Sequence, residues 1–365
     1  SARFLEGRAE QPAPAGDRAR LIVEASYVLP LRRAAGEPGL EELAAYLRWL
    51  ARHVEVVVAD GSEPDAFAEN AQAWGPGVVH VPVVNRPRRY GKVIGVHVGM
   101  EAASHEAVII ADDDVRYSLP ALEQVVEALG TAELVRPQNY FDPLPWHAAW
   151  DIARILLNRA VGQDSPGTLA VRRSFFVAMG GYSDEVMYEN LELIRTVAAH
   201  GGRVADRPDV YVRRVPGTVR RFLEQRPRQA YDDFAQPAKL LGFLAVGPLT
   251  AWTARRGSAW PIAALAAGAV AMAEMGRRRH GGTGFFPARC SWHAPLWMAE
   301  RSVWVWLALL YRISGGVPCA GTRFRVPAHS MAELRLRARA RAVASVAEGR
   351  GAGSAAPAQG DHGAP

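Results

Sequence analysis

The chain has 365 residues, of which 49% are hydrophobic and 22% charged, a balance typical of a globular protein with ample core material. Lys and Arg outnumber Asp and Glu by 43 to 37. This positive surplus is compatible with a negatively charged partner, such as nucleic acid, anionic lipid or a phosphorylated substrate. The two cysteines, Cys290 and Cys319, exclude a disulfide framework and a CxxC metal site. Residues 1–20 are polar and lack the apolar core of a signal peptide, and we expect them to be disordered.

Apolar runs and helical patterns then alternate along the chain. Strands are predicted where β-branched and apolar residues cluster, at 21–30, 54–59, 78–84 and 108–111. Helices are predicted between and after these runs, at 40–50, at 64–74, up to residue 100 and from residue 118 onward. Strands and helices that alternate with short links predict an α/β fold with a mostly parallel central sheet covered on both faces.

The fourth apolar run ends abruptly in three acids, Asp112, Asp113 and Asp114. Burying an unpaired carboxylate is costly, so these side chains must face water, cations or a ligand. In a strand-like geometry Asp112 and Asp114 point one way and Asp113 the other. Two carboxylates that converge at the carboxyl end of a strand suit a hard divalent cation. The alternative is an acidic strand-to-helix turn in which an Asp caps the helix.

Two more strand ends carry charged groups. Asp60 ends the second strand, and a basic segment that includes Arg89 and Lys92 follows the third. Ligands of open α/β sheets bind outside the carboxyl ends of the strands. Two acidic strand ends and one cationic loop on one edge therefore predict a site for a nucleotide diphosphate and a metal ion. A helix-capping turn for Asp60 and a solvated loop for the cations are the alternatives.

The order and spacing of these motifs resemble the family 2 glycosyltransferases. The motifs that carry the resemblance are 27–30, 59–62, 91–92, 112–114, 167–173, 180–182, 189–193 and 225–228. The resemblance covers residues 21–235 and implies a catalytic domain with the nucleotide-diphospho-sugar transferase (GT-A) fold. It also implies an enzyme that moves a sugar from a nucleoside diphosphate sugar to an acceptor.

The resemblance assigns a role to each motif of the donor site. Asp60 would contact the base or ribose of the donor, and Asp112 would face the ribose. Asp114 would be the more direct ligand of Mg²⁺ or Mn²⁺, so that Asp112 and Asp114 form the metal motif. The cation would stabilise the charge that the leaving diphosphate gains. Further donor contacts are implied for Lys92, Gly167, Thr168 and Arg228, with Gln225 shaping the acceptor mouth.

The chain departs from the family where a general base is expected. The family has Glu-Asp before a helix, whereas this chain has Glu189-Asn190, and Asn cannot take up a proton at neutral pH. Three interpretations stay open: Glu189 is the base, Glu192 is the base, or the protein binds donor with little catalysis. A Glu that merely favours the helix start is the structural alternative for Glu189.

Two features of the sequence concern the acceptor: a group of aromatic residues and a second difference from the family pattern. Trp146, His147 and Trp150 could form an acceptor platform, although core packing explains them equally well. The motif at 225–228 resembles the Gln-x-x-Arg-Trp motif of membrane-bound members, but Gln229 stands where the Trp would be. The transfer of a single sugar therefore fits better than synthesis of a long polymer.

Residues 236–312 are predicted to form apolar, membrane-associated helices. The apolar runs at 239–252 and 259–273 are each shorter than the roughly 20 residues that span a bilayer. Arg clusters flank them, which suits a surface of anionic lipid, and residues 295–312 have the pattern of an interfacial helix. We expect a membrane-associated protein with a cytoplasmic catalytic domain, and whether the helices span is open. A turn and a basic helix are expected over 313–345, and disorder over 346–365.

The resemblance, taken with these patterns, implies a metal-dependent glycosyltransferase that moves a single sugar from a nucleoside diphosphate sugar to a lipid-linked, saccharide or membrane-proximal acceptor. The alternative function is a non-catalytic nucleotide-sugar-binding or scaffold protein on the same fold, which Asn190 motivates. Nucleic acid is not expected as a partner, because no helix face carries a basic pattern suited to reading bases.

Overall fold

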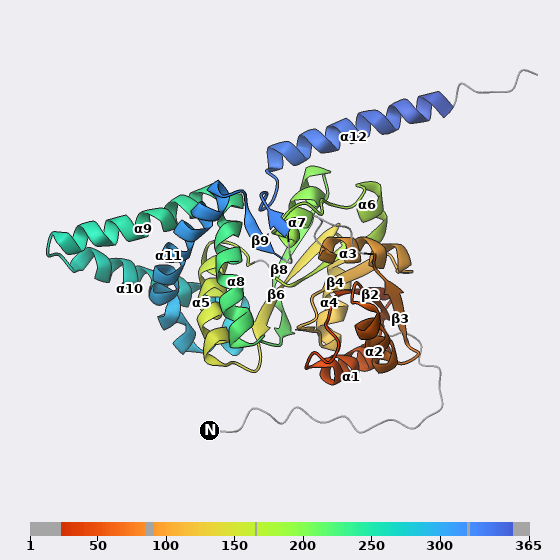
Figure 1. The fold of residues 1–365 in the computed structure, drawn as a ribbon, viewed down its shortest axis with the longest axis horizontal. Helices are drawn as coiled ribbons and strands as arrows, with labels where there is room; N and C mark the ends of the chain where they lie inside the picture. Colours follow the sequence, from red (N-terminus) through yellow and green to blue (C-terminus); the bar gives the residue numbers. More distant parts are fainter. Residues whose placement is uncertain (1–22, 85–90, 165, 320–321, 353–365) are drawn as a thin grey trace, which may run out of the picture.

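The computed structural model describes residues 23–84, 91–164, 166–319 and 322–352 (Figure 1). An eight-stranded sheet runs through the body of the molecule in the order β3-β2-β1-β4-β7-β6-β8-β5. The four predicted strands are β1 (Ala25–Leu31), β2 (Glu55–Asp60), β3 (Val78–Pro82) and β4 (Ala107–Ala111). They pair in parallel, β3 with β2, β2 with β1 and β1 with β4, as the alternation of strands and helices predicts.

The other half of the sheet mixes directions. Its strands are β5 (Val115–Arg116), β6 (Leu134–Phe141), β7 (Thr168–Arg172) and β8 (Val204–Arg214). Strand β7 lies antiparallel between β4 and β6, and β8 is parallel to β6 and antiparallel to β5. The register of β4 and β7 sets Ala111 opposite Thr168, so the segment before β7 lies beside the segment that follows β4.

Helices cover both faces of the sheet. Helices α1 (Leu40–Leu50), α2 (Pro64–Trp74) and α4 (Leu119–Leu129) pack on one face, where Leu47, Leu50 and Leu122 are fully buried. Helices α3 (Gly91–Ala102), α6 (Arg173–Ala178) and α7 (Glu189–Ala199) pack on the other. Helix α3 approaches β1 so closely that a Cβ at Gly99 would lie 2.3 Å from Cγ1 of Val28, so Gly is required there.

A layer of helices stands against the free face of β6 and β8. It contains α5 (Trp146–Val161), α8 (Val219–Tyr231), the 3-10 helix η1 (Asp232–Ala235), α9 (Pro237–Arg255), α10 (Trp260–Arg278) and α11 (Ala294–Ile313), with two short 3-10 helices, η2 (Arg279–Gly284) and η3 (Ala288–His293). Ile152 and Leu156 of α5 are buried with Ala273 of α10 and Val305 of α11. A helix predicted to lie at a membrane interface, α11, therefore packs its apolar face inside the protein.

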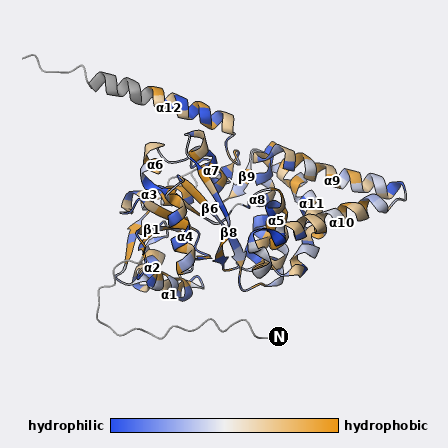
Figure 2. Ribbon diagram, turned by 180° about the vertical axis from the view of Figure 1, so that it is seen from behind, coloured by the Kyte–Doolittle hydropathy of each residue, from blue (hydrophilic) through white to orange (hydrophobic). Residues whose placement is uncertain are grey.

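Helices α9 and α10 form a hairpin that projects from the body (Figures 1 and 2). Several large apolar side chains on it are exposed, including Leu241, Trp252 and Trp260. Within the described part of the chain, however, no helix is both long enough and apolar enough to cross a bilayer. This finding contradicts the predicted membrane association and the localisation derived from it.

The chain ends in a hairpin and a long helix. Strands β9 (Val317–Cys319) and β10 (Thr322–Phe324) pair antiparallel, and α12 (Met331–Ala352) extends away from the body (Figure 1). The predicted helix at 331–345 is thus present, but it continues through residues 346–352, where we expected disorder. The predicted disorder at residues 1–20 and 353–365 lies outside the described residues.

Candidate functional site

Two segments of the sheet meet at the carboxyl end of β4. Asp112 follows β4, and its backbone N–H donates to the carbonyl of Gly167 at 3.0 Å. The N–H of Gly167 in turn donates to Oδ1 of Asn139 at 2.6 Å, which ties this edge to β6. A Cβ at Gly167 would lie 2.8 Å from Oδ2 of Asp112 and from Cζ of Arg214, so a larger residue would have to displace these two side chains. Thr168 turns its hydroxyl into the core, where it donates to the carbonyl of Ile110 at 2.7 Å.

Opposite charges gather on this edge and form what we call the strand-end wall: Lys92, Asp112, Asp114 and Arg214. Nζ of Lys92 lies 2.5 Å from Oδ1 of Asp112 and 2.5 Å from Oε1 of Glu189. Nη2 of Arg214 lies 3.3 Å from Oδ2 of Asp112 and 2.8 Å from Oδ2 of Asp114. Burial alone would raise the pKa of Asp112, but the charges of Lys92 and Arg214 hold it below its usual value.

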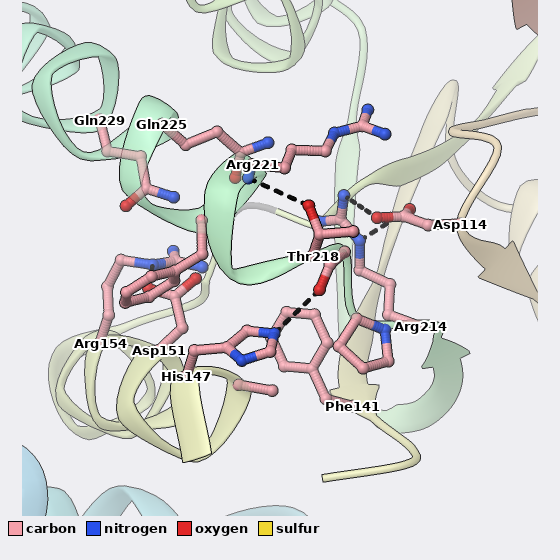
Figure 3. Close-up of a pocket in the computed structure, with 14 residues that line it drawn as sticks. Asp114, Phe141, His147, Asp151, Arg154, Arg214, Thr218, Arg221, Gln225 and Gln229 are labelled. Atoms are coloured by element: carbon pink, nitrogen blue, oxygen red, sulfur yellow. Dashed lines mark hydrogen bonds and ion pairs between the residues drawn. The ribbon is translucent and has the colours of Figure 1, made fainter. Parts of the chain in front are cut away.

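The predicted alternation of the three acids agrees with these contacts. Asp112 and Asp114 share the guanidinium of Arg214, whereas Asp113 lies 4.0 Å from Arg221. Burial, together with the neighbouring charge of Asp114, raises the pKa of Asp113. Asp114 meets Arg214 at the rim of a smaller cavity of about 80 Å³ (Figure 3).

The strand-end wall also bears on a metal ion. One guanidinium spans both carboxylates, so Asp112 and Asp114 are spaced to share a single cation. Carboxylate oxygens are the ligands that Mg²⁺ and Mn²⁺ prefer. Among the described residues no group of three or more His, Cys, Asp or Glu side chains could hold a metal. The two carboxylates therefore fit a cation that takes its remaining ligands from water or from a bound diphosphate.

A polar cavity of about 270 Å³ opens beside this wall. The predicted site residues that line it are Asp112, Gly167, Glu189, Asn190, Gln225 and Arg228. The structure thus brings together residues from four separate motifs. The amide of Asn190 donates to the carbonyl of Pro166 at 2.9 Å, so it orders the segment before β7.

The opposite side of the cavity is formed by helices α8, α9, α11 and η1. Its charged residues, which we call the helical wall, are Arg228, Asp232, Asp233, Lys239 and Arg301. Asp233 lies 3.2 Å from Arg301 and 3.7 Å from Lys239. Sequence reasoning found Arg228 but missed the other four, although the two adjacent acids at the end of an Arg-rich helix were a visible signal.

Sequence reasoning also missed Arg154 and Arg214. Arg214 ends β8, a strand that the sequence did not predict, and Arg154 lies on α5 and pairs with Asp164 at 2.7 Å. Both arginines line the two cavities, together with Gln225 and Gln229 (Figure 3). Cations therefore surround the site on both sides.

Two predicted residues lie elsewhere. Glu192 is fully buried one helical turn beyond Glu189, and it accepts from the backbone N–H of His329 at 2.8 Å and contacts its Nδ1 at 2.6 Å. The prediction that Glu192 could replace Glu189 as base is therefore wrong, because the first turn of α7 faces the cavity and Glu192 points to the segment before α12.

Asp60 is the second predicted residue that lies outside the cavity. It is 1% exposed, and its carboxylate accepts hydrogen bonds from the backbone N–H of Ser62 and the side-chain amide of Asn70, each at 2.8 Å. It lines neither cavity. Burial would raise the pKa of Asp60, but these hydrogen bonds and His80 hold it below its usual value. Of the basic segment, Lys92 is in the strand-end wall, whereas Arg89 lies outside the described residues.

The three residues of the predicted aromatic platform do not lie together. Trp146 is 61% exposed and meets Phe222 edge to face, with 5.7 Å between the ring centroids. His147 lines the smaller cavity, and its Nε2 donates to the carbonyl of Gly217 at 2.8 Å (Figure 3). Trp150 instead donates to Glu300 of α11 and belongs to the packing of the helical layer.

Comparison with known families gives one match. Residues 37–169 match the sequence model described as Glycosyl transferase family 2, a little over a third of the chain. The matched span contains Asp60, Lys92, Asp112, Asp114 and Gly167. This match agrees with the predicted family over residues 37–169, and the sheet topology confirms the predicted α/β fold with a mostly parallel sheet. Comparison with curated proteins gives no match.

Several solved structures are similar at low identity. The mannosyltransferase PcManGT from Pyrobaculum calidifontis, in complex with GDP-Man and Mn²⁺, is 19% identical with a TM-score of 0.48, over 78% of this chain and 87% of that chain. Glucosyl-3-phosphoglycerate synthase from Mycobacterium tuberculosis, in complex with phosphoglyceric acid, is 19% identical with a TM-score of 0.41, over 60% and 84%. Both TM-scores are below 0.5, so these similarities assign neither donor nor acceptor.

Proposed function

We propose that this chain, whose residues 37–169 match the model of glycosyl transferase family 2, transfers a single sugar from a nucleoside diphosphate sugar to a hydroxyl of a lipid-linked or saccharide acceptor. The observation that carries the proposal is the strand-end wall, which opens onto a polar cavity of about 270 Å³. Open α/β sheets bind their ligands at such strand ends.

The strand-end wall suits the diphosphate of the donor. Asp112 and Asp114 would hold Mg²⁺ or Mn²⁺ through their carboxylate oxygens, and the cation would offset the charge that the diphosphate gains as it leaves. Arg214 and Arg228 supply fixed positive charge on the same cavity. Lys92 holds Asp112 and Glu189 in position from the other side.

The rest of the donor would follow the edge of the sheet. The sugar would lie near Gly167 and Thr168 at the start of β7, where Gly167 lines the polar cavity. The nucleoside would extend along the ends of β1 and β2 toward Asp60. Because Asp60 accepts from Ser62 and Asn70, its effect on the base or ribose would come through the turn that it orders.

The acceptor would enter against the helical wall. Gln225 and Gln229 line both cavities from α8 and offer amide groups to acceptor hydroxyls (Figure 3). Phe222 lines the smaller cavity, and the exposed Trp146 packs against it, so these rings are available to contact a sugar. Gln229 stands where polymer-forming members of the family have a Trp, which favours a single transfer.

A non-catalytic nucleotide-sugar-binding protein is the second candidate. Asn190 favours it, because an amide accepts no proton and Nδ2 is held by the carbonyl of Pro166. The two candidates differ in turnover and agree in nucleotide binding.

The test measures the release of UDP or GDP from UDP-glucose, UDP-N-acetylglucosamine and GDP-mannose in the presence of Mn²⁺. Asp114→Asn is expected to lower release about 1,000-fold, because the leaving diphosphate loses its main counter-charge. The adjacent Asp113→Asn is the control and should stay within about threefold, since Asp113 lies nearer Arg221 than Arg214. Absence of release with every donor, alongside intact nucleotide binding, would support the binding protein instead.

A further inference from the structure

Asp232 occupies an unusual position in the cavity. Helix α8 ends at Tyr231, and Asp232 opens the 3-10 helix η1 on the same cavity as Asp112, Glu189 and Asn190. Its Oδ1 is buried and accepts no hydrogen bond from the part of the chain that the structure describes. A buried carboxylate oxygen without a donor is costly and uncommon, so the position needs an explanation.

The neighbouring Asp233 has counter-charges. Its carboxylate lies 3.2 Å from Arg301 and 3.7 Å from Lys239, and the residue is 1% exposed. Oδ2 of Asp233 also accepts no hydrogen bond among the described residues, but the charge of Arg301 lies beside it. The two adjacent acids therefore differ in role. Asp233 anchors η1 to α9 and α11, and this anchor fixes Asp232 at the cavity.

The other residues that could accept the proton are paired with a cation, lack a basic group or lie outside this cavity. Glu189 is paired with Lys92 at 2.5 Å, so its carboxylate is already engaged by an ammonium group. Asn190 cannot accept a proton, and Glu192 is buried against His329 outside this cavity. Of the other carboxylates that line the cavity, Asp112 is paired with Lys92 and Asp233 is paired with Arg301.

We propose that Asp232 is the catalytic residue that takes the proton from the acceptor hydroxyl. The assignment rests on the proposed function and deepens it. In the step, the acceptor O–H proton passes to the carboxylate of Asp232 while the acceptor oxygen forms a bond to the anomeric carbon. The bond from that carbon to the diphosphate breaks, and its electron pair leaves with the nucleoside diphosphate. Asp232 then returns the proton to water.

The electrostatic surroundings suit this role. Burial, with the charge of Glu189, raises the pKa of Asp232 to about 8, although Arg301 opposes the rise. The charged groups that face it are Glu189 on α7, Arg228 on α8, Asp233 on η1, Lys239 on α9 and Arg301 on α11. The titratable thiol of Cys319 on β9 also lies near it, and burial raises the pKa of that thiol. A base is most effective when its pKa lies near the working pH. Because the ionised form is the base, turnover should rise with pH and level off above about 8.

The experiment follows nucleotide release from UDP-glucose and GDP-mannose, with water as acceptor, between about pH 6 and pH 9.5. Asp232→Asn is expected to lower release by about 100-fold or more and to remove the rising limb, while UDP and GDP bind as in the wild type. Glu189→Gln should lose about tenfold in rate but keep the limb, because its role is to hold Lys92. Asp232→Glu should recover part of the rate.

Three results would overturn the assignment. These are a wild-type rate that does not change across this pH range, an Asp232→Asn rate within about threefold of the wild type, or a limb that disappears in Glu189→Gln instead. If Asp232→Asn does not fold, Asp232→Ser gives the same comparison. A wild type that releases nucleotide from neither donor would contradict the proposed function itself, which distinguishes the two failures.

Discussion

The strand-end wall and the helical wall lie on opposite sides of one cavity, yet they differ in how their carboxylates are paired with cations. In the strand-end wall every carboxylate has a cation within 3.3 Å, and Lys92 and Arg214 each serve two carboxylates. In the helical wall Asp233 takes the counter-charges and Asp232 has a buried oxygen that no described residue reaches. Paired charges keep a fixed geometry for a diphosphate, whereas an unpaired carboxylate keeps its affinity for a proton.

The chain's two lysines give the sharpest comparison, because one belongs to each wall. Lys92→Gln should lower nucleotide release about 1,000-fold, since Asp112 and Glu189 both lose a partner at 2.5 Å. Lys239→Gln should lower it by no more than about tenfold, because Asp233 keeps Arg301. Steady-state release measured at saturating donor tests both variants. Equal losses of nucleotide release in the two variants would show that the two lysines, and so the two walls, do not differ in their importance for the reaction.

Arg214 gives a smaller effect, on stability. Arg214→Met leaves Asp112 and Asp114 facing each other, and we expect the free energy of unfolding to fall by about 3 kcal/mol. Urea unfolding with and without Mn²⁺ measures it, and the metal should restore part of the loss by replacing the guanidinium. The control is Arg213→Met, a more exposed arginine that pairs with Asp142, and it should change stability by less than about 1 kcal/mol. No effect of Mn²⁺ on Arg214→Met would argue against a shared cation position.

The smallest expected effect separates the two glutamates of α7. Glu192→Gln should reduce stability by about 1–3 kcal/mol, because its carboxylate bonds His329 in the interior, and turnover of the folded protein should stay within about threefold. Glu189→Gln should do the reverse, with a slower reaction and little change in stability. Urea unfolding and nucleotide release on the same preparations give both numbers. Loss of turnover in a stable Glu192→Gln would return Glu192 to the site.

The strand-end wall was largely predictable because it follows from local patterns. An apolar run that ends in three acids fixes a buried strand and a polar strand end, and parallel strands bring such ends to one edge. Asp112, Asp114 and Lys92 are found together for this reason, whereas Gly167 reaches this edge through the antiparallel pairing of β7 with β4. Arg214 was not predicted, because it depends on the long-range pairing of β8 with β5 and β6.

The helical wall was less predictable, since it depends on how helices far apart in sequence pack. The contacts of Asp233, and with them the position of Asp232, require α9 and α11 to meet at the end of α8, and no local pattern sets that arrangement. The direction of α7 decided between Glu189 and Glu192, which local sequence left open. The apolar run of α11 indicated a membrane interface, but its Trp297 and Val305 are buried against other helices.

The most direct test of the account is calorimetric binding of UDP and GDP in the presence of Mn²⁺ to Asp114→Asn and Asp232→Asn. If the strand-end wall binds the diphosphate and the helical wall transfers the proton, Asp114→Asn should weaken binding of the preferred nucleotide at least tenfold. Asp232→Asn should bind it as the wild type does. Wild-type affinity in Asp114→Asn, together with lost affinity in Asp232→Asn, would contradict this division of the site.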